Sequence, residues 1–463
     1  MTEASVRNGL DLGPKLSIHI VGIGGAGMRA IGLVLATMGH SITGSDLKSS
    51  AGLDRLVAAG IKITIGHARQ NVGQVDLVAR STAVADENIE IREARERSIP
   101  VVSRAELLSA ITRIKPTISV AGTHGKTTTS SMLAVLLAQA NLNPSFIIGG
   151  EVNEIGCGAL WEPDSNLFVV EADESDGTFL TLDSDYGIIT NVEPDHLGQY
   201  GDEANLRAAF NQFLKNIKNK AFVCLDDEGL TGLVRETNVI TYGVNPEADY
   251  SIVDYKGSRF GSRFSLNGPS GKLGDFSLAT PGIYNVQNAV AALSFADYLG
   301  ADLNLLREGL AQFGGVARRF HYRGEKNGIS FIDDYAHLPT EVSSVLQAAK
   351  EGDWGRIICV FQPHRYSRTQ DFWSDFSHSF QNADVVYVTG IYSAGESPIP
   401  GVSGRLIADT VRESESGKQV VYCEHRTELV DHIRSELTQG DLCLTLGAGD
   451  ITTLPTELMS GLA

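Results

Sequence analysis

The sequence predicts an α/β protein that is divided into several domains, and three observations carry this prediction. Short apolar runs alternate with amphipathic helical stretches along almost the whole chain, which is the pattern of parallel sheets covered by helices. Two glycine-rich loops, at residues 22–27 and 120–129, each follow an apolar run and open a helical stretch. The length of 463 residues suits two to four domains, each with its own core.

The expected elements fall into three groups along the chain. The first has strands at 17–21, 41–43, 75–78 and 100–102 and a helix at 28–38, and it ends near the polar segment 113–116. The second has strands at 117–121, 167–170 and 187–190, helices at 126–140 and 281–299, and an alternating, glycine-rich antiparallel meander at 249–277. The third follows a hinge around 313–319 and has strands at 329–332, 356–361, 385–388 and 442–444 and a helix at 340–350.

Composition limits the kinds of binding partner that the protein can have and the cellular compartment in which it is expected. The net charge is -18, so most of the surface repels nucleic acid and anionic membranes. The five cysteines are scattered without a C-x-x-C pair, which indicates neither a zinc site nor a disulfide framework. Residues 1–15 lack the apolar core of a signal peptide, and no apolar run approaches the roughly 20 residues that span a bilayer. We expect a cytoplasmic protein, monomeric or homodimeric, without nucleic-acid or membrane partners.

The first glycine-rich loop fits G-x-G-x-x-G between a strand and a helix, and an acidic residue ends the next strand. The glycines let the backbone approach a diphosphate, and the helix N-terminus adds amide donors. A dinucleotide and a UDP-sugar both present a diphosphate, so the pattern leaves both ligands open. Its candidate binding residues are Gly22, Gly24, Gly25, Ala26, Gly27 and Asp46.

The second loop, VAGTHGKTTT at 120–129, indicates an ATP-binding phosphate loop. Backbone amides cradle phosphates in such a loop, Lys126 reaches the terminal phosphates, and the Thr127 hydroxyl suits Mg²⁺. Val120 stands where the usual pattern has its first glycine. Two phosphate loops in separate domains favour an enzyme that joins two phosphate-bearing substrates, since a dehydrogenase has no need of the second.

Acidic residues follow two later strands of the second domain. Residues 171–176 read EADESD, and residues 191–196 read NVEPDH. Because the carboxyl ends of parallel strands meet at one sheet edge, both segments are expected to converge on the phosphate loop, where Mg²⁺ ligands belong. The pattern also leaves open a solvated acidic turn and a structural histidine.

Cationic residues cluster at strand ends in the third domain. Arg318 and Arg319 sit at the hinge, residues 333–337 read DDYAH, and residues 364–368 read HRYSR. Arginine suits bidentate carboxylate or phosphate binding, so these clusters predict an anion site. Each arginine taken alone could equally be a surface charge.

From about residue 18 to residue 449 the chain resembles the Mur ligase family. The resemblance rests on GIGGAGM, AGTHGKTTT, EADESD, TNVEPDH, PGIYNVQNA, RRF, DDYAH, HRYSRT and LGAGD. It implies an N-terminal Rossmann-like domain for a UDP-sugar (1–112), a central P-loop ATPase-like domain (113–316) and a C-terminal Rossmann-like domain that helps bind the amino acid (317–463). It also implies ATP and Mg²⁺ as cofactors, UDP-N-acetylmuramate and L-alanine as substrates, and an acyl phosphate intermediate.

The resemblance also implies roles for individual residues. The catalytic set is Lys126, Glu171, His196, Asp334 and His337. The metal ligands are Thr127, Glu171 and His196. The ATP-binding set is Gly122, Thr123, His124, Gly125, Lys126, Thr127, Thr128, Asn285, Asn288, Arg319 and Asp334. The amino-acid pocket comprises Tyr335, His337, His364, Arg365 and Arg368.

Two positions depart from the pattern of the family members that this chain resembles most, because Leu338 and Tyr284 each stand where a histidine is usual there, although other members also lack the histidine at 338. Leu338 leaves open a different preferred amino acid or a non-catalytic homologue. A murein-peptide-recycling ligase of the same family is a second possible function. The first loop alone would also suit an NAD-dependent oxidoreductase.

Overall fold

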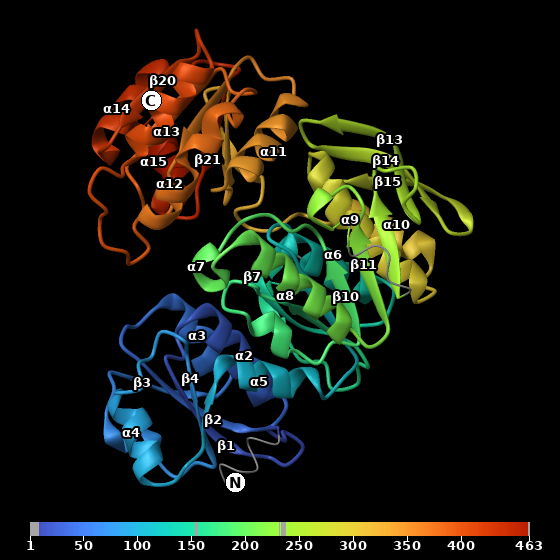
Figure 1. The fold of residues 1–463 in the computed structure, drawn as a ribbon, viewed down its shortest axis with the longest axis vertical. Coiled ribbons are helices and arrows are strands. Elements are labelled where there is room, and N and C mark those ends of the chain that lie inside the picture. Colours follow the sequence, from blue (N-terminus) through green and yellow to red (C-terminus); the bar gives the residue numbers. More distant parts are fainter. Residues whose placement is uncertain (1–8, 153–155, 231, 233–237, 462–463) are drawn as a thin grey trace. The chain divides into compact units, whose positions relative to one another are not determined.

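The structure, a computed structural model, describes residues 9–152, 156–230, 232 and 238–461. Its strands form three sheets (Figure 1). The chain divides into two compact units, one of residues 1–252, 267–273 and 287–309, the other of residues 253–266, 274–286 and 310–463. Within the described ranges, every helix is too short or too polar to traverse a lipid bilayer.

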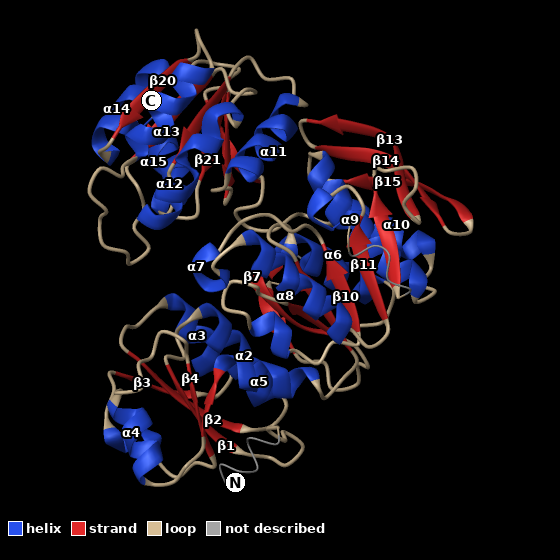
Figure 2. Cartoon of the chain, in the orientation of Figure 1, coloured by secondary structure: helices blue, strands red, loops and turns tan. Residues whose placement is uncertain are grey.

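The first sheet contains five parallel strands in the order β3-β2-β1-β4-β5. Its strands are β1 (Ser17–Val21), β2 (Ser41–Asp46), β3 (Lys62–Ile65), β4 (Leu77–Arg80) and β5 (Val101–Ser103). Its helices are α2 (Ala26–Thr37), α3 (Ala51–Ala58), α4 (Ile89–Glu96), α5 (Arg104–Thr112) and the 3-10 helix η1 (Arg69–Val72). Figure 2 shows α2, α3 and α5 on one side of this sheet and α4 on the other. Strand order reverses at β1, so the loop after β1 lies where α/β sheets bind ligands.

The second sheet has ten strands in the order β15-β14-β13-β12-β11-β10-β6-β9-β7-β8. The parallel neighbours of β6 (Thr117–Ala121) are β9 (Phe168–Glu171) and β10 (Tyr186–Ile189). The register pairs Val120 with Glu171 and Ala121 with Ile189, so the carboxyl ends of the three strands meet at one edge. The remaining strands are β7 (Ser145–Val152), β8 (Cys157–Leu160), β11 (Lys220–Cys224), β12 (Val239–Gly243), β13 (Tyr250–Ser258), β14 (Gly261–Gly268) and β15 (Gly271–Leu278).

Helices and 3-10 helices connect these strands. They are α6 (Lys126–Gln139), η2 (Thr178–Thr181), α7 (Leu197–Tyr200), α8 (Glu203–Asn216), η3 (Glu228–Leu230), α9 (Ile283–Tyr298) and α10 (Leu303–Gln312). Residues 128–134 of α6 are all buried, so the packing of this helix holds the loop that precedes it in place.

The third sheet has the order β16-β17-β21-β18-β19-β20. Five strands are parallel, namely β17 (Ile329–Asp334), β18 (Ile357–Phe361), β19 (Val385–Thr389), β20 (Gln419–Cys423) and β21 (Leu442–Leu446), and β16 (His321–Lys326) is antiparallel at the edge. Buried clusters cover both faces. Its helical elements are α11 (Pro339–Lys350), α12 (Tyr366–Phe372), η4 (Trp373–His378), α13 (Gly404–Ser414), α14 (Arg426–Glu436), η5 (Asp450–Thr453) and α15 (Leu454–Gly461).

The α/β class and the main strands expected from sequence are confirmed. Strands β1 and β6 match their expected bounds, and most other expected elements shift by one to three residues at an end. The expected meander at 249–277 corresponds to β13, β14 and β15, which extend the second sheet. Strands β3, β7, β8, β11, β12, β16 and β20 were not among the named expectations.

Candidate functional site

The first glycine-rich loop is closed on itself and on strand β2. The amides of Gly22 and Ile23 donate to the carbonyl of Ser45 at 2.8 and 3.1 Å, and Gly22 has φ +78°. The Gly24 amide donates to Asp46 Oδ2 at 2.8 Å, and a Cβ at Gly24 would lie 2.6 Å from that oxygen. Asp46 therefore holds the loop that the sequence predicted it to accompany. Gly25 caps α2, which Ala26 and Gly27 begin.

A buried carboxylate joins the two strands next to this loop. Glu90, at the start of α4, is fully buried and accepts hydrogen bonds from the Ser45 hydroxyl, from Asn71 Nδ2 at 2.6 Å and from the Ala68 amide at 3.1 Å. His19 Nε2 lies 3.4 Å away. Burial alone would raise the pKa of Glu90, but these hydrogen bonds lower it to about 2. Glu90 is thus an anion at neutral pH, and it links α4 to β1 and β2.

The second loop has the backbone of a phosphate cradle. Gly122 and Gly125 adopt φ +137° and +80°, and Gly125 caps α6 in a left-handed conformation. Asn191, shortly after β10, anchors the loop, because its carbonyl accepts the Thr123 amide at 3.1 Å and its Oδ1 accepts the His124 amide at 2.8 Å.

Lys126 packs against this loop with its side chain 12% exposed, and it is paired with an acid. Its Nζ donates to the Gly122 carbonyl at 2.6 Å and to the two carboxylate oxygens of Glu174 at 2.9 and 2.7 Å. Burial alone would lower the pKa of Lys126, yet the carboxylates of Glu174, Asp173 and Glu171 raise it. Burial also raises the pKa of Glu174 to about 7, against the attraction of Lys126. Lys126 is therefore an ammonium at neutral pH, held in a crowded acidic cluster.

Two of the three predicted metal ligands lie together. The Thr127 hydroxyl donates to Glu171 Oε1 at 2.9 Å, and Glu171 Oε2 accepts the Gly149 amide at 2.6 Å. Hydroxyl and carboxylate oxygens suit Mg²⁺, so this pair fits the ion. His196 has φ +53°, and its Nε2 lies 3.2 Å from Asp195. The structure therefore pairs His196 with Asp195 and Glu171 with Thr127.

The two asparagines of helix α9 have separate environments. Asn288 Oδ1 accepts the buried Thr129 hydroxyl at 3.1 Å, and a Cβ at Gly125 would lie 2.5 Å from it. Asn288 thus packs directly on the phosphate loop, whose Thr128 is also buried. Asn285 is buried and donates to the Pro281 carbonyl at 2.7 Å, just before its own helix begins.

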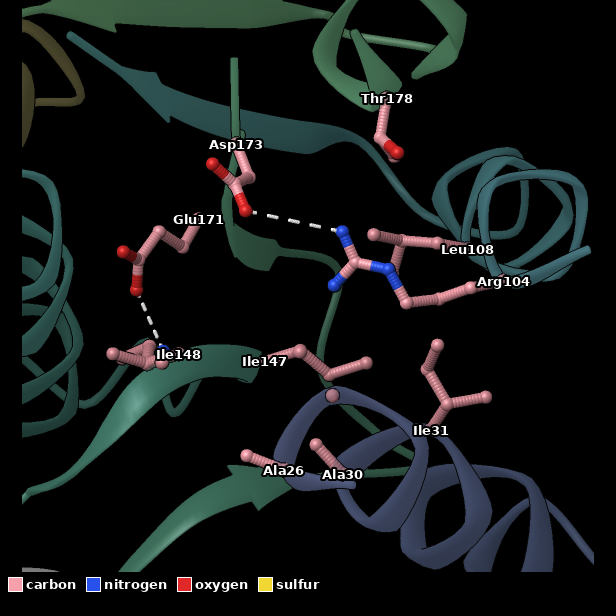
Figure 3. Close-up of a pocket in the computed structure, with 12 residues that line it drawn as sticks. Ala26, Ala30, Ile31, Arg104, Leu108, Ile147, Ile148, Glu171, Asp173 and Thr178 are labelled. Atoms are coloured by element: carbon pink, nitrogen blue, oxygen red, sulfur yellow. Dashed lines mark hydrogen bonds and ion pairs between the residues drawn. The ribbon is translucent and has the colours of Figure 1, made fainter. Parts of the chain in front are cut away.

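A pocket joins the first loop's helix to the acidic edge of the second sheet. It has a volume of about 230 Å³, and its lining includes Gly27, Arg104, Ile148, Glu171 and Asp173. In Figure 3 the Arg104 guanidinium points toward Asp173, and the distance to that carboxylate is 3.9 Å. Arg104 is also 3.1 Å from Asp176. The pocket therefore places a cation and a candidate metal ligand around one space.

The third sheet carries the next predicted group at the end of β17. Asp334 is buried, and its two oxygens accept the amides of Phe320 and Ala336 at 2.6 and 2.7 Å. Burial raises the pKa of Asp334 to about 6, although Arg319 lowers it. The guanidinium groups of Arg318 and Arg319 lie 4.8 and 4.9 Å from the ring centre of Tyr335. The RRF and DDY segments thus form one cationic, aromatic cluster.

Two histidines of this domain, His337 and His364, form a second cluster. The ring centroids of His337 and His364 are 5.7 Å apart, and Arg368 lies 3.0 Å from His364 Nδ1. Burial, followed by His337 and the nearby arginines, lowers the pKa of His364 to about 4. Arg365 has φ +72° and lies 3.7 Å from Glu396. The structure therefore brings DDYAH and HRYSR together within this domain.

The two side chains that depart from the expected pattern are a buried leucine and a partly buried tyrosine. Leu338 is 3% exposed and precedes α11, where Glu341 accepts its amide at 3.2 Å. Tyr284 packs against the core of the third sheet, and burial raises the pKa of its hydroxyl.

One further group of metal-ligating side chains occurs among the described residues. The ligand atoms of Cys423, Glu428 and His432 all lie within 4.8 Å of one another. Glu428 and His432 are exposed on α14. The spacing of the cysteines did not indicate this group, because the other two members are a glutamate and a histidine on the helix that follows Cys423.

Glu174, Asn191 and Arg104 are the contact residues that sequence reasoning did not select. Glu174 and Asn191 lie inside segments that were singled out, EADESD and NVEPDH, but the pattern did not separate them from their neighbours. Arg104 follows β5 in the first domain and carried no motif signal.

Family models match three consecutive parts of the chain. They are the Mur ligase family catalytic domain at residues 17–115, the Mur ligase middle domain at 120–296 and the Mur ligase glutamate ligase domain at 318–449. Together they span most of the chain, including both glycine-rich loops and the clusters of the third sheet.

Individual relatives agree with these matches. A UDP-N-acetylmuramate–L-alanine ligase of Myxococcus xanthus is 42% identical over 446 residues, which are 96% of this chain and 94% of the relative. The crystal structure of a UDP-N-acetylmuramate-alanine ligase of Thermotoga maritima matches with a TM-score of 0.79 at 31% identity, covering 96% of this chain and 98% of that one. A murein peptide ligase of Psychrobacter arcticus shares the fold, with a TM-score of 0.66 at 23% identity over 97% of this chain and 99% of that one.

Proposed function

The chain belongs to the Mur ligase family, and from this premise we propose that it joins L-alanine to the carboxylate of UDP-N-acetylmuramate in an ATP-dependent, ADP-forming reaction of peptidoglycan synthesis. The observation that carries the proposal is the pocket lined by Gly27, Arg104 and Glu171. It connects the helix that follows the diphosphate-type loop with the sheet edge that holds Lys126. A UDP-sugar and ATP bound to these two loops meet there.

The chemistry follows from the poor reactivity of a carboxylate. Direct attack by an amine would have to expel oxide, so the carboxylate first attacks the γ-phosphorus of ATP, which releases ADP and forms an acyl phosphate. The alanine amine then attacks the acyl carbon, and phosphate leaves as the amide forms. Positioning and charge neutralisation supply most of the rate in such transfers.

We assign the charge neutralisation to the residues of the phosphate loop. Lys126 contacts the terminal phosphates, and the amides of residues 122–128 surround them. Thr127 and Glu171, with His196, would hold Mg²⁺, and the ion would supply positive charge against the phosphate groups of ATP. Asn285 and Asn288 are proposed near the adenine, and Arg319 and Asp334 as further ATP contacts.

The amino-acid side of the reaction is assigned to the third domain. Tyr335, His337, His364, Arg365 and Arg368 provide cations and ring faces suited to a carboxylate. The alanine ammonium must lose a proton before it attacks, and His337 and Asp334 are the candidate bases. The low pKa of His364 keeps that ring neutral at pH 7, so it serves as a hydrogen-bonding group and Arg368 as the charge.

We also propose domain boundaries near residues 112 and 316, a cytoplasmic location and a monomer or homodimer. The first family-model match ends at 115, near the first boundary, and the third begins at 318, near the second, while the middle match covers 120–296. The five cysteines, all of them within the described ranges, form no disulfide, which suits a reducing compartment.

The experiment is a substrate-omission assay of ADP release with Mg-ATP, UDP-N-acetylmuramate and L-alanine. The proposal predicts ADP release only when all three are present, with L-alanine preferred over glycine and L-serine. Release that depends on a murein tripeptide instead of L-alanine would favour the recycling ligase, and hydride transfer from NADH would favour the oxidoreductase. Nucleotide binding without turnover on any amino acid would favour a non-catalytic homologue.

A further inference from the structure

All the hydrogen-bond donors of the Lys126 ammonium are used by oxygen atoms of the chain itself. Its contacts are the carbonyls of Gly122 and Thr123, at 2.6 and 3.3 Å, and both carboxylate oxygens of Glu174, at 2.9 and 2.7 Å. An ammonium has three protons to donate. A phosphate oxygen therefore cannot bind Lys126 until at least one of these acceptors leaves.

Glu174 is the acceptor that must leave. The two carbonyls belong to the loop backbone that shapes the cradle, whereas the Glu174 carboxylate is a side chain. The backbone of Glu174 is held separately, because its carbonyl accepts the Tyr200 hydroxyl and the Gly177 amide, the latter at 3.1 Å. Release of Lys126 thus needs a change of side-chain torsions at Glu174 and no movement of the chain.

The surroundings disfavour an arrangement in which Lys126 binds Glu174 and a phosphate at the same time. Glu174 is 1% exposed, and the carboxylates of Asp173 and Glu171 act on the same lysine. A triphosphate added beside an unmoved Glu174 would bring further negative charge into a site with little solvent to screen it.

We propose that Glu174 is an internal competitor for the phosphate site: it holds Lys126 in the nucleotide-free protein and yields it to the terminal phosphate of ATP. This inference rests on the proposed function, because it takes ATP as the ligand of the loop. Glu174 then acts as a positioning residue. It keeps the lysine beside the loop. It also makes weakly charged anions poor ligands, because exchanging the carboxylate for such an anion yields little binding free energy.

The test is equilibrium binding of ATP to the full-length protein in the presence of Mg²⁺, measured by displacement of a fluorescent ATP analogue. Glu174→Gln keeps the size of the side chain and removes its charge. Because a charge-assisted hydrogen bond is replaced by a neutral one, the Kd for ATP is expected to fall about tenfold. Inorganic phosphate should also compete more strongly with the analogue in this variant.

Asp176→Asn is the matched control. It removes the same charge from the same segment, but the Asp176 carboxylate lies 3.1 Å from Arg104 and accepts the Thr178 amide at 3.0 Å, so its partners differ from those of Glu174. Its Kd for ATP should change less than about twofold, as expected for a partly screened charge. Glu174→Met, neutral and of similar volume, replaces Glu174→Gln if thermal unfolding shows that the glutamine variant does not fold.

The outcomes separate this inference from the proposed function. Tighter ATP binding in the Glu174 variant, but not in Asp176→Asn, supports the competitor role. Unchanged or weaker ATP binding in the Glu174 variant overturns it, as does a fall in kcat at unchanged Kd, which would indicate a catalytic residue instead. A wild-type protein that does not bind ATP overturns the proposed function and the inference with it.

Discussion

The ammonium of Lys126 lies where the terminal phosphates of ATP are proposed to bind, so its removal tests the phosphate loop directly. Lys126→Ala should lower kcat at least about a hundredfold, the usual cost of losing one group that stabilises transition-state charge. The fold should survive, because Glu174 already has a raised pKa and can stay protonated without its partner. Thermal unfolding checks the fold. A Lys126→Ala variant with wild-type kcat would contradict the assignment.

Substitution of Glu171 tests whether this side chain binds Mg²⁺. Its oxygens accept the Thr127 hydroxyl and the Gly149 amide, and the charge that remains suits a divalent cation. Glu171→Gln should raise the Mg²⁺ concentration needed for half-maximal activity at least about tenfold, and a chelator should abolish turnover of the wild type. The measurement is a Mg²⁺ titration at saturating ATP. An unchanged midpoint would remove Glu171 from the ligand set.

The residues of the site show how far sequence reasoning reaches. The phosphate loop has fixed spacing, so Lys126 and Thr127 could be proposed as phosphate and metal contacts from the string alone. The partner of Lys126 could not, because Glu174 is 48 residues away and its side-chain direction depends on a turn after β9. Asn191 and Asn288 were invisible as loop anchors for the same reason: their contacts exist only after β6, β10 and α9 pack together.

At the scale of elements, the entry to α6 depends on one glycine. Gly125 has φ +80°, and a Cβ there would lie 2.5 Å from Asn288 Oδ1. Gly125→Ala should lower the free energy of unfolding by more than the roughly 1–2 kcal/mol of left-handed strain, and should weaken ATP binding. Gly60→Ala is the control, because φ is +82° there with open space around it. Equal effects of the two substitutions in denaturant unfolding would show that the contact with Asn288 does not matter.

Glu90 joins α4 to the first sheet, and its contribution depends on pH. Its pKa is about 2 in the folded protein and 4.5 as an ordinary glutamate. A lowered carboxyl pKa stabilises the fold above the unfolded pKa, and this stability is lost as the pH falls from about 4.5 to about 2. Glu90→Gln should therefore cost about 3 kcal/mol at pH 7. Denaturant unfolding of both proteins should show the difference shrinking below pH 4.5, and a pH-independent difference would refute the ionic role.

An element could be predicted from the sequence when its own residues carry the pattern, such as an apolar run bounded by a turn. Strands β1 and β6 were placed within their bounds because apolar runs end in glycine-rich turns there. Strand β3 was missed because three of its four residues are exposed and it therefore lacks a buried apolar run. Strand β7 was missed because two glycines interrupt it, although the sheet pairs it with β8 and β9.

At the scale of the whole molecule, the three sheets combine two parallel Rossmann-like arrangements with a P-loop sheet, as the resemblance implied. Parallel strands bring loops distant in sequence to one edge in each sheet, which is why most candidate residues lie near strand carboxyl ends, whereas Asn285 and Asn288 lie on α9. Because the net charge is -18, the proposal assigns the anionic substrates to local cations, such as Lys126 in the first unit and Arg319 and Arg368 in the second.

The central claim is that the chain activates the sugar carboxylate as an acyl phosphate, and oxygen transfer tests it most directly. UDP-N-acetylmuramate labelled with ¹⁸O in both carboxylate oxygens is incubated with Mg-ATP, L-alanine and the protein, and the released phosphate is analysed by mass spectrometry. Activation by phosphoryl transfer predicts one ¹⁸O atom in each phosphate, because the bridging oxygen leaves with phosphorus when the amide forms. Amide formation with unlabelled phosphate would contradict the account.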